Sequence, residues 1–394
     1  MIYIKFLNIT LIVTFIFSFN VNALEYKLYG LVQPEFSIFT NGDGKHHQSK
    51  NNYSFFTKGN FISYLDERDA KITISAIARY DEKDSERRYI DFQKLKYEQY
   101  FENYTFKIGN EIIFWGVNES FNIIDIINQS NLAEDMTGTK KLGQPLLSLA
   151  YDNNYGTIDL YLMPYFIERK FPSKNGRPRL ALEVDQNSIT YESSSKEQKL
   201  DFALRYSMVY DDYDIGIAHF HGNNRAPQLN INPSTLKFNP HYTTLSQTSL
   251  DIQATKGAWL YKLEALSAKD GNERHLGVAG GFEYTFYGIR DSQSDLGLVI
   301  EYSFDDRNSY PFNNDSVAAL RWTKNDINST SLLAGMFIDM RGNSNRFIAE
   351  YEQRINNNVK LFIDATFNGS IDSQDFTYAF EEDSVFSIKL ARYF

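Results

Sequence analysis

Val385-Phe386-Ser387-Ile388-Lys389-Leu390-Ala391-Arg392-Tyr393-Phe394 closes the chain with alternating apolar and polar or small residues and ends on an aromatic ring. Successive side chains of a strand point to opposite faces. This period of two therefore divides the stretch into an apolar face (Phe386, Ile388, Leu390, Phe394) and a polar or small one (Ser387, Lys389, Ala391). The closing strand of a membrane barrel has this character, because one face meets lipid and the other meets an aqueous lumen.

The N-terminal residues have the pattern of a secretory signal peptide. Lys5 precedes an apolar stretch at 6–19, and Val21-Asn22-Ala23 provides a cleavage site of small residues. The apolar stretch is too short for a spanning helix. We therefore expect residues 1–23 to be removed and residues 24–394 to form the exported protein. No segment of that mature chain is a spanning helix by length, so any membrane insertion must use strands.

Composition narrows the class of protein further. The chain has 27 Tyr and 31 Phe but three Trp. Aromatic residues form the girdles of membrane barrels at the two interfaces between lipid and water. It has no Cys, which excludes disulfides and thiolate metal chemistry. The net charge is -10, and this acidic balance disfavours nucleic acid as a partner. We expect neither a cofactor nor a metal.

Segments of about ten residues with alternating polarity recur from residue 24 onward. Eight short turns rich in Asn, Asp, Gly or Ser lie at 66–69, 102–103, 153–156, 211–214, 256–257, 292–295, 325–328 and 356–358. Nine longer links lie near 40–52, 81–88, 112–144, 165–198, 222–243, 269–274, 305–315, 340–344 and 369–383.

This alternation of short and long links predicts an all-β protein, a transmembrane antiparallel up-and-down barrel of about 18 strands, with 16 as the alternative. Short turns of bacterial barrels face the periplasm, so we expect both termini there. A soluble antiparallel sandwich also has alternating strands. The signal peptide, the aromatic load, the link pattern and the terminal Phe394 together favour the barrel.

Strand alternation also predicts which side chains face lipid and which face the lumen. In the clearest strands, Trp259, Tyr261 and Ile300 belong to the lipid face. The charged residues predicted to line the pore from the strands are Lys262, Glu264, Glu283, Glu301, Arg321, Arg346, Glu350, Arg354 and Asp364. The lumen wall is thus expected to carry charges of both signs.

The link at 111–145 is too apolar for a freely solvated loop. Phe121, Ile124, Ile127 and Asn131 recur at helical spacing, which predicts a short helix over 121–132. We expect this partly helical segment to fold inside the barrel as a constriction or plug, with a compact external lid as the alternative.

Three acidic residues of this link complete the predicted constriction. They are Glu119, Asp125 and Glu134. Because arginine and carboxylate form directional pairs, we expect them to pair with Arg321, Arg346 and Arg354 of the wall.

Several short motifs in and after this link carry a family resemblance. They are Trp115-Gly116, Asp125-Ile126-Ile127-Asn128, Gly143-Gln144-Pro145, Pro164-Tyr165-Phe166 and Arg169-Lys170-Phe171-Pro172. Together they are similar to a tract in poorly characterised, porin-like outer-membrane proteins of Gram-negative bacteria. The resemblance implies a large barrel with an internal plug-like segment and implies no substrate. The C-terminal stretch likewise resembles the assembly signal of such barrels, with Arg392 as its one departure.

Three other groups of residues have side chains that could form a site. His47 and Ser49 have the spacing of a base and a nucleophile in outer-membrane phospholipases, but they lie in a loop rich in Gly, Asn and Lys. His219 and His221 share a strand face, which we assign to the membrane interface rather than to a metal. A basic cluster (Arg169, Lys170, Lys174, Arg177, Arg179) is either solvated or contacts anionic groups at the outer mouth.

Taken together, these patterns predict a porin-like channel of the Gram-negative cell outer membrane for passive or facilitated diffusion of small hydrophilic solutes. The first alternative is a plugged component of an export or envelope-assembly system, and the second is an outer-membrane lipid hydrolase that uses His47 and Ser49. The expected partners are outer-membrane lipids and lipopolysaccharide, the barrel assembly machinery, small solutes and possible periplasmic proteins.

Overall fold

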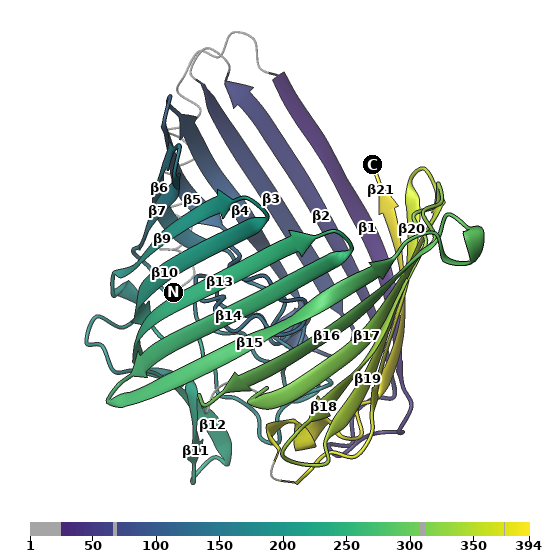
Figure 1. The fold of residues 1–394 in the computed structure, drawn as a ribbon. Helices are drawn as coiled ribbons and strands as arrows, with labels where there is room; N and C mark the ends of the chain where they lie inside the picture. The colour runs from purple at the N-terminus through teal and green to yellow at the C-terminus, as the bar shows by residue number, and fades with distance from the viewer. Residues whose placement is uncertain (1–24, 66–68, 308–311, 374) are drawn as a thin grey trace.

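The computed structural model describes residues 25–65, 69–307, 312–373 and 375–394, which form one closed antiparallel barrel (Figure 1). The predicted signal peptide, residues 1–23, lies outside the described residues. The sheet has 18 strands, and β1 pairs with β21 to close it. The predicted fold class and strand number are confirmed.

The barrel strands follow one another around the wall in chain order. Their bounds are β1 Glu25–Phe39, β2 Asn51–Leu65, β3 Ala70–Asp81, β4 Tyr89–Tyr100, β5 Tyr104–Glu111, β6 Gln144–Asn153, β7 Gly156–Met163, β9 Asp201–Tyr210, β10 Tyr213–Asn223, β13 Thr244–Lys256, β14 Trp259–Asp270, β15 Glu273–Phe286, β16 Asp295–Asp305, β17 Asn314–Thr323, β18 Ser331–Asp339, β19 Asn345–Asn356, β20 Val359–Asn368 and β21 Val385–Tyr393.

The connections follow the predicted alternation with one exception. Seven of the eight predicted short turns join the expected strands, and most of the eighth, 66–69, lies outside the described residues. The predicted longer link near 269–274 is instead a two-residue turn at Gly271 and Asn272. Gly271 has a φ of +57°, a conformation that glycine adopts more readily than other residues, and this residue allows β14 and β15 to join tightly.

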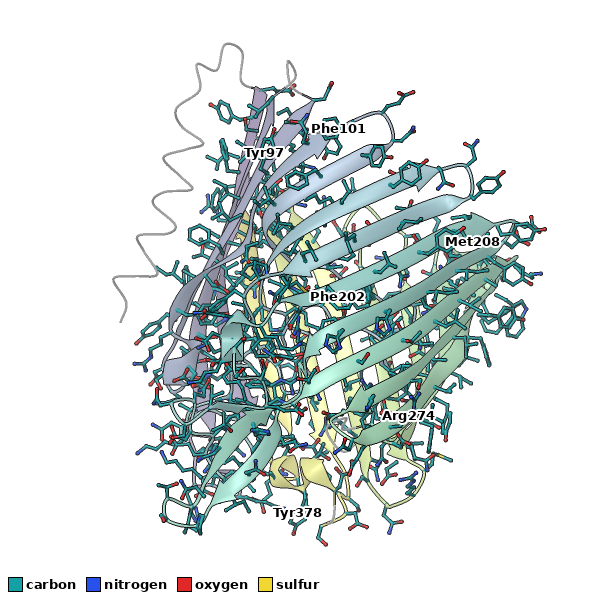
Figure 2. The ribbon with its side chains drawn as sticks, turned by 90° about the vertical axis from the view of Figure 1, so that its left-hand side faces the viewer. Tyr97, Phe101, Phe202, Met208, Arg274 and Tyr378 are labelled. Atoms are coloured by element: carbon teal, nitrogen blue, oxygen red, sulfur yellow. The ribbon has the colours of Figure 1, made fainter. Side chains whose placement is uncertain are left out.

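The two faces of the wall match the sequence alternation. Trp259, Tyr261 and Ile300 are 38%, 44% and 38% exposed on the outside, whereas Glu264 and Glu301 on the lumen side are 0% and 1% exposed. Figure 2 shows side chains along the outside of the wall. Tyr97 and Phe101 lie near the short-turn end there, and Tyr378 lies near the end with the long links.

The long links build a second layer at one end of the barrel, at the bottom of Figure 1. A three-stranded sheet there consists of β8 Thr190–Tyr191, β11 Gln228–Asn232 and β12 Lys237–Tyr242. The described residues also contain four 3₁₀ turns: η2 Ser85–Arg87, η3 Lys196–Gln198 and η5 Phe376–Phe380 in the long links, and η4 Ile289–Asp291 in the short link between β15 and β16.

No helix in the described ranges has the length and apolar composition needed to cross a membrane.

The link between β5 and β6 is irregular, and the helix predicted over 121–132 does not form. Its only ladder contacts are isolated bridges, including Ser130 with Lys141 and Asn131 with Lys170. The prediction was wrong because the helical spacing reports burial and not helix. These apolar side chains pack on the barrel wall, and the N–H groups of Asn131 and Leu132 donate to the carbonyls of Lys140 and Lys170 in place of helical partners.

Candidate constriction inside the barrel

Two carboxylates of the lumen wall hold the segment 112–143 through its backbone. Glu264 lies on β14 and Glu301 on β16. Glu264 accepts hydrogen bonds from four backbone N–H groups, those of Val117 (2.8 Å), Asn118 (3.0 Å), Ile123 (2.9 Å) and Ile124 (3.4 Å). Glu301 accepts hydrogen bonds from the backbone N–H groups of Glu119 (2.7 Å) and Ser120 (2.8 Å). A buried hydrogen bond contributes about 0.5–1.5 kcal/mol, so these six together fix the segment firmly.

Apolar packing on the wall completes the attachment. Phe121, Ile124 and Ile127 are fully buried, and the Phe121 ring lies 5.6 Å from Phe312 and 5.8 Å from Phe337. The buried wall residues in the same cluster come from strands all around this side of the barrel and include Leu146, Met163, Phe220, Leu245, Leu266 and Val317. Burying side chains of this size contributes about 1.5–3 kcal/mol each, and this packing keeps the segment within the lumen.

The far end of the segment is attached to the opposite wall. Glu134 accepts a hydrogen bond from the Tyr89 hydroxyl at 2.8 Å and lies 2.9 Å from the Arg79 guanidinium. Arg79 also pairs with Glu35 of β1 at 2.6 Å. Because the segment is bound to β14 and β16 at one end and to β3 and β4 at the other, it crosses the lumen.

Four of the predicted constriction residues lie together where the segment meets β14 to β17. Arg321 lies 2.7 Å from Glu119 and 3.2 Å from Glu283. Lys262 lies 3.9 Å from Glu119. The side chains of Arg321 and Glu119 remain 30% and 38% exposed, so charged groups of both signs still face open space beside the segment.

The other predicted pairs do not form. Asp125 pairs with Lys141 inside the segment at 3.1 Å, and Glu134 pairs with Arg79 in place of an arginine from β17 or β19. Arg346 donates to Asn368 at 2.8 Å, and the exposed Arg354 lies near the turn at 356–358, far along β19 from the segment.

Two further predicted residues face the lumen elsewhere on the wall. Asp364 of β20 pairs with Lys389 of β21 at 2.5 Å. Glu350 of β19 stands opposite Asp364 in the strand register, so its side chain shares the lumen face.

Sequence reasoning missed two arginines that bind the segment from the long-link end. The Arg307 guanidinium donates to the carbonyl of Ile123 at 3.0 Å, and Arg225 donates to that of Ile127 at 3.0 Å. Arg225 is itself paired with Asp201 at 2.7 Å. Both arginines follow the end of a strand, where the period of two that identifies lumen residues has stopped, so alternation gave no signal for them.

Lys58 and Lys94 were also missed, although alternation along β2 and β4 could have found them. Lys58 stands opposite Ile77 in the register, and Lys94 stands opposite the buried Ser75, on the same face as Lys96 and Glu98. Both lysines therefore face the lumen.

The three other candidate groups have structural partners in place of a site. His47 contacts Asp43 at 2.9 Å while Ser49 donates to the carbonyl of Asn51, so the two side chains of the supposed hydrolase pair do not bond to each other. The described residues contain no cluster of His, Asp and Glu that suits a metal, and His219 bonds to Thr248 at 2.9 Å.

The basic cluster of the link at 164–200 is largely internal. Arg177 pairs with Asp383 at 2.6 Å, and Arg169 donates to Gln129 at 3.0 Å. Burial lowers the pKa of Arg169 to about 10. Only Lys170 and Lys174 of this cluster are exposed, so the sequence cluster is not a cationic surface in the fold.

Comparison with known proteins supports the fold and nothing finer. No family model matches the chain, and no curated protein matches it. Among solved structures, a BenF-like porin from Pseudomonas fluorescens Pf-5 is similar with a TM-score of 0.56 at 9% identity, over 94% of this chain and 98% of that one. OprB of Pseudomonas putida (TM-score 0.45, 11% identity, 94% of each chain) and OmpF of Salmonella typhi in complex with daunomycin (0.47, 11%, 94% and 97%) are also similar. The chain thus has the fold of a porin-like β-barrel.

Proposed function

We propose that this protein is a channel for the diffusion of small hydrophilic solutes across the outer membrane, with the segment 112–143 as its constriction. The observation that carries the proposal is the binding of six backbone N–H groups of this segment by Glu264 and Glu301 of the lumen wall. In this proposal both termini lie in the periplasm, lipid and lipopolysaccharide surround the wall, and the barrel assembly machinery inserts the chain.

The size and chemistry of the lumen support a polar path. Barrels of 16 to 18 strands leave room for an aqueous channel, and the segment fills part of that room. The partly exposed Arg321, Glu119 and Lys389 line what remains with charges of both signs. Hydrated solutes pass such a surface without losing their hydrogen bonds, whereas an apolar surface would exclude them.

Conductance in planar bilayers tests the proposal directly. The purified wild-type chain is expected to conduct, and a variant lacking residues 120–136 is expected to conduct more, because the strands on both sides of the deletion remain paired. Heat-modifiability on gels verifies that both barrels are folded. A wild-type chain without conductance contradicts the channel, and a folded deletion variant with unchanged conductance contradicts the constriction.

The plugged export component has one observation in its favour. Arg225 and Arg307 bind the same segment from the long-link end, so the lumen is filled from two directions. This alternative predicts no conductance for the wild-type chain and the appearance of conductance only on deletion of residues 120–136. The lipid hydrolase has no such support, because His47 and Ser49 do not bond to each other.

A further inference from the structure

Lysines on the lumen face of β2 to β4 differ in whether they have a carboxylate partner. Lys71 and Lys96 both pair with Glu98 at 3.1 Å. Lys58 and Lys94 form no ion pair within the described ranges, and the hydrogen-bond partner of Lys58 is the neutral amide oxygen of Gln93 at 2.9 Å. The described part of the lumen thus contains two lysines that have no carboxylate within ion-pair distance.

The local strand structure brings these groups together. The register of β3 and β4 shifts between Ser75 and Ala76, so Gln93 is the extra residue of a β-bulge beside Lys94. From there its amide reaches Lys58 across β3, so Lys94, the next residue of β4, lies on the same stretch of the lumen wall as Lys58. Two like charges held in one place oppose each other unless an anion lies between them.

We propose that Lys58, Lys94 and Gln93 form a binding site for the carboxylate or phosphate group of an anionic solute. The two ammonium groups and the Gln93 amide N–H₂ are donors, and oxyanions accept such charge-assisted hydrogen bonds at about 2.7–2.9 Å. Leu31 and Ile77 flank Lys58 in the register and give the site apolar sides. This inference rests on the proposed channel function and gives the channel a preference for anionic solutes.

Direct binding of inorganic phosphate tests the site without measuring current. Phosphate linewidths in ³¹P NMR give the dissociation constant for the full mature chain in detergent free of lipopolysaccharide, for wild type, Lys58→Gln/Lys94→Gln and Lys71→Gln. Lys71→Gln removes one charge from the same wall, but from a lysine that has a carboxylate partner. The double variant should bind phosphate about tenfold more weakly or worse, because one lost charge-assisted bond corresponds to about that factor. Lys71→Gln should bind as wild type does.

Competition by acetate then separates the two ligand chemistries. If acetate displaces phosphate, the site accepts carboxylates as well as phosphates. If acetate does not displace phosphate, the carboxylate part of the proposal is wrong and the site binds phosphate groups alone. The proposal is overturned if the wild type binds no phosphate, or if the double variant and Lys71→Gln bind it equally well. A chain that binds phosphate but conducts no ions contradicts the channel and leaves the anion site in place, so the two failures are distinguishable.

Discussion

Phe394, the last residue, closes the barrel on Gly30 of the first strand through two backbone hydrogen bonds. The Phe394 N–H donates to the Gly30 carbonyl at 3.0 Å, and the Gly30 N–H donates to a Phe394 carboxylate oxygen at 2.9 Å. A Cβ at position 30 would lie 2.9 Å from the Phe394 ring and 2.5 Å from the carbonyl oxygen of Lys58. The ring thus covers the strand where Gly30 has no side chain, a known way of stabilising a glycine in a sheet.

Substitution of Gly30 tests this closure. We expect Gly30→Val to cost about 1–3 kcal/mol, since overpacking forces either the ring or the β2 backbone to move. Urea unfolding in detergent, followed by gel mobility, measures the change. Gly59→Val on β2 is the matched control, because a Cβ there meets nothing within 4 Å. Equal destabilisation by the two substitutions would contradict the role of the ring.

Removal of the terminal ring tests assembly. We expect Phe394→Ser to lower the amount of protein in the outer membrane, because the last strand is both the predicted assembly signal and the closing strand of the barrel. Tyr155→Ser is the control, since Tyr155 is an exposed aromatic residue in another short turn. Quantification of the protein in the outer-membrane fraction gives the result. If the Phe394→Ser variant reaches wild-type levels there, Phe394 is not required as an assembly signal.

The lipid and lumen faces predict opposite responses to an introduced charge. Ile300→Lys places an ammonium in the lipid and should cost about 2–4 kcal/mol if the position lies near the bilayer midplane. Thr285→Lys on the neighbouring strand places it in the lumen, opposite Gly297 and next to Glu283. We expect this second variant to unfold in urea close to wild type. If Thr285→Lys is less stable in urea than Ile300→Lys, the lipid and lumen faces assigned to β15 and β16 are wrong.

The sequence was sufficient for the barrel and insufficient for the contacts inside it. Strand number and faces follow from a local period of two, because each strand separates lipid from water, and the bulge at Gln93 interrupts this period in β4. The pairs of the constriction are set by register between distant strands, so Glu119 with Arg321 was one success among several wrong pairings. The mistaken helix over 121–132 has the same origin, because Glu264, which accepts the N–H groups of Ile123 and Ile124, lies more than a hundred residues away in the chain.

A buried ion pair between two long links predicts how the outer layer is held. Arg177 and Asp383 lie 2.6 Å apart with side chains 3% and 4% exposed. Burial raises the pKa of Asp383, while Arg177 acts to lower it. We expect Arg177→Ala to destabilise the outer layer by about 3–5 kcal/mol, because the variant leaves a buried acid without its partner.

Limited proteolysis of intact outer membranes measures this effect. The links at 164–200 and 369–384 should become cleavable in Arg177→Ala, while the exposed Lys174→Ala in the same link should remain as resistant as wild type. Arg177→Ala/Asp383→Asn should recover part of the loss, since the uncompensated acid is then gone. Resistance in Arg177→Ala equal to wild type would show that other contacts hold the layer.

The carboxylate of Glu264 is predicted to be the main attachment of the constriction. Glu264→Gln retains the size of the side chain but leaves one acceptor oxygen for four N–H groups and directs a new N–H₂ toward them. Each buried N–H left without a partner costs about 1–3 kcal/mol, so the segment should detach while the strands remain paired. We expect larger conductance with more noise in planar bilayers and an unchanged urea midpoint for the barrel.

Glu283→Gln is the matched control, because Glu283 pairs with Arg321 of the wall and accepts none of these N–H groups. If Glu264→Gln conducts like Glu283→Gln, the segment is held by its apolar packing and not by this carboxylate.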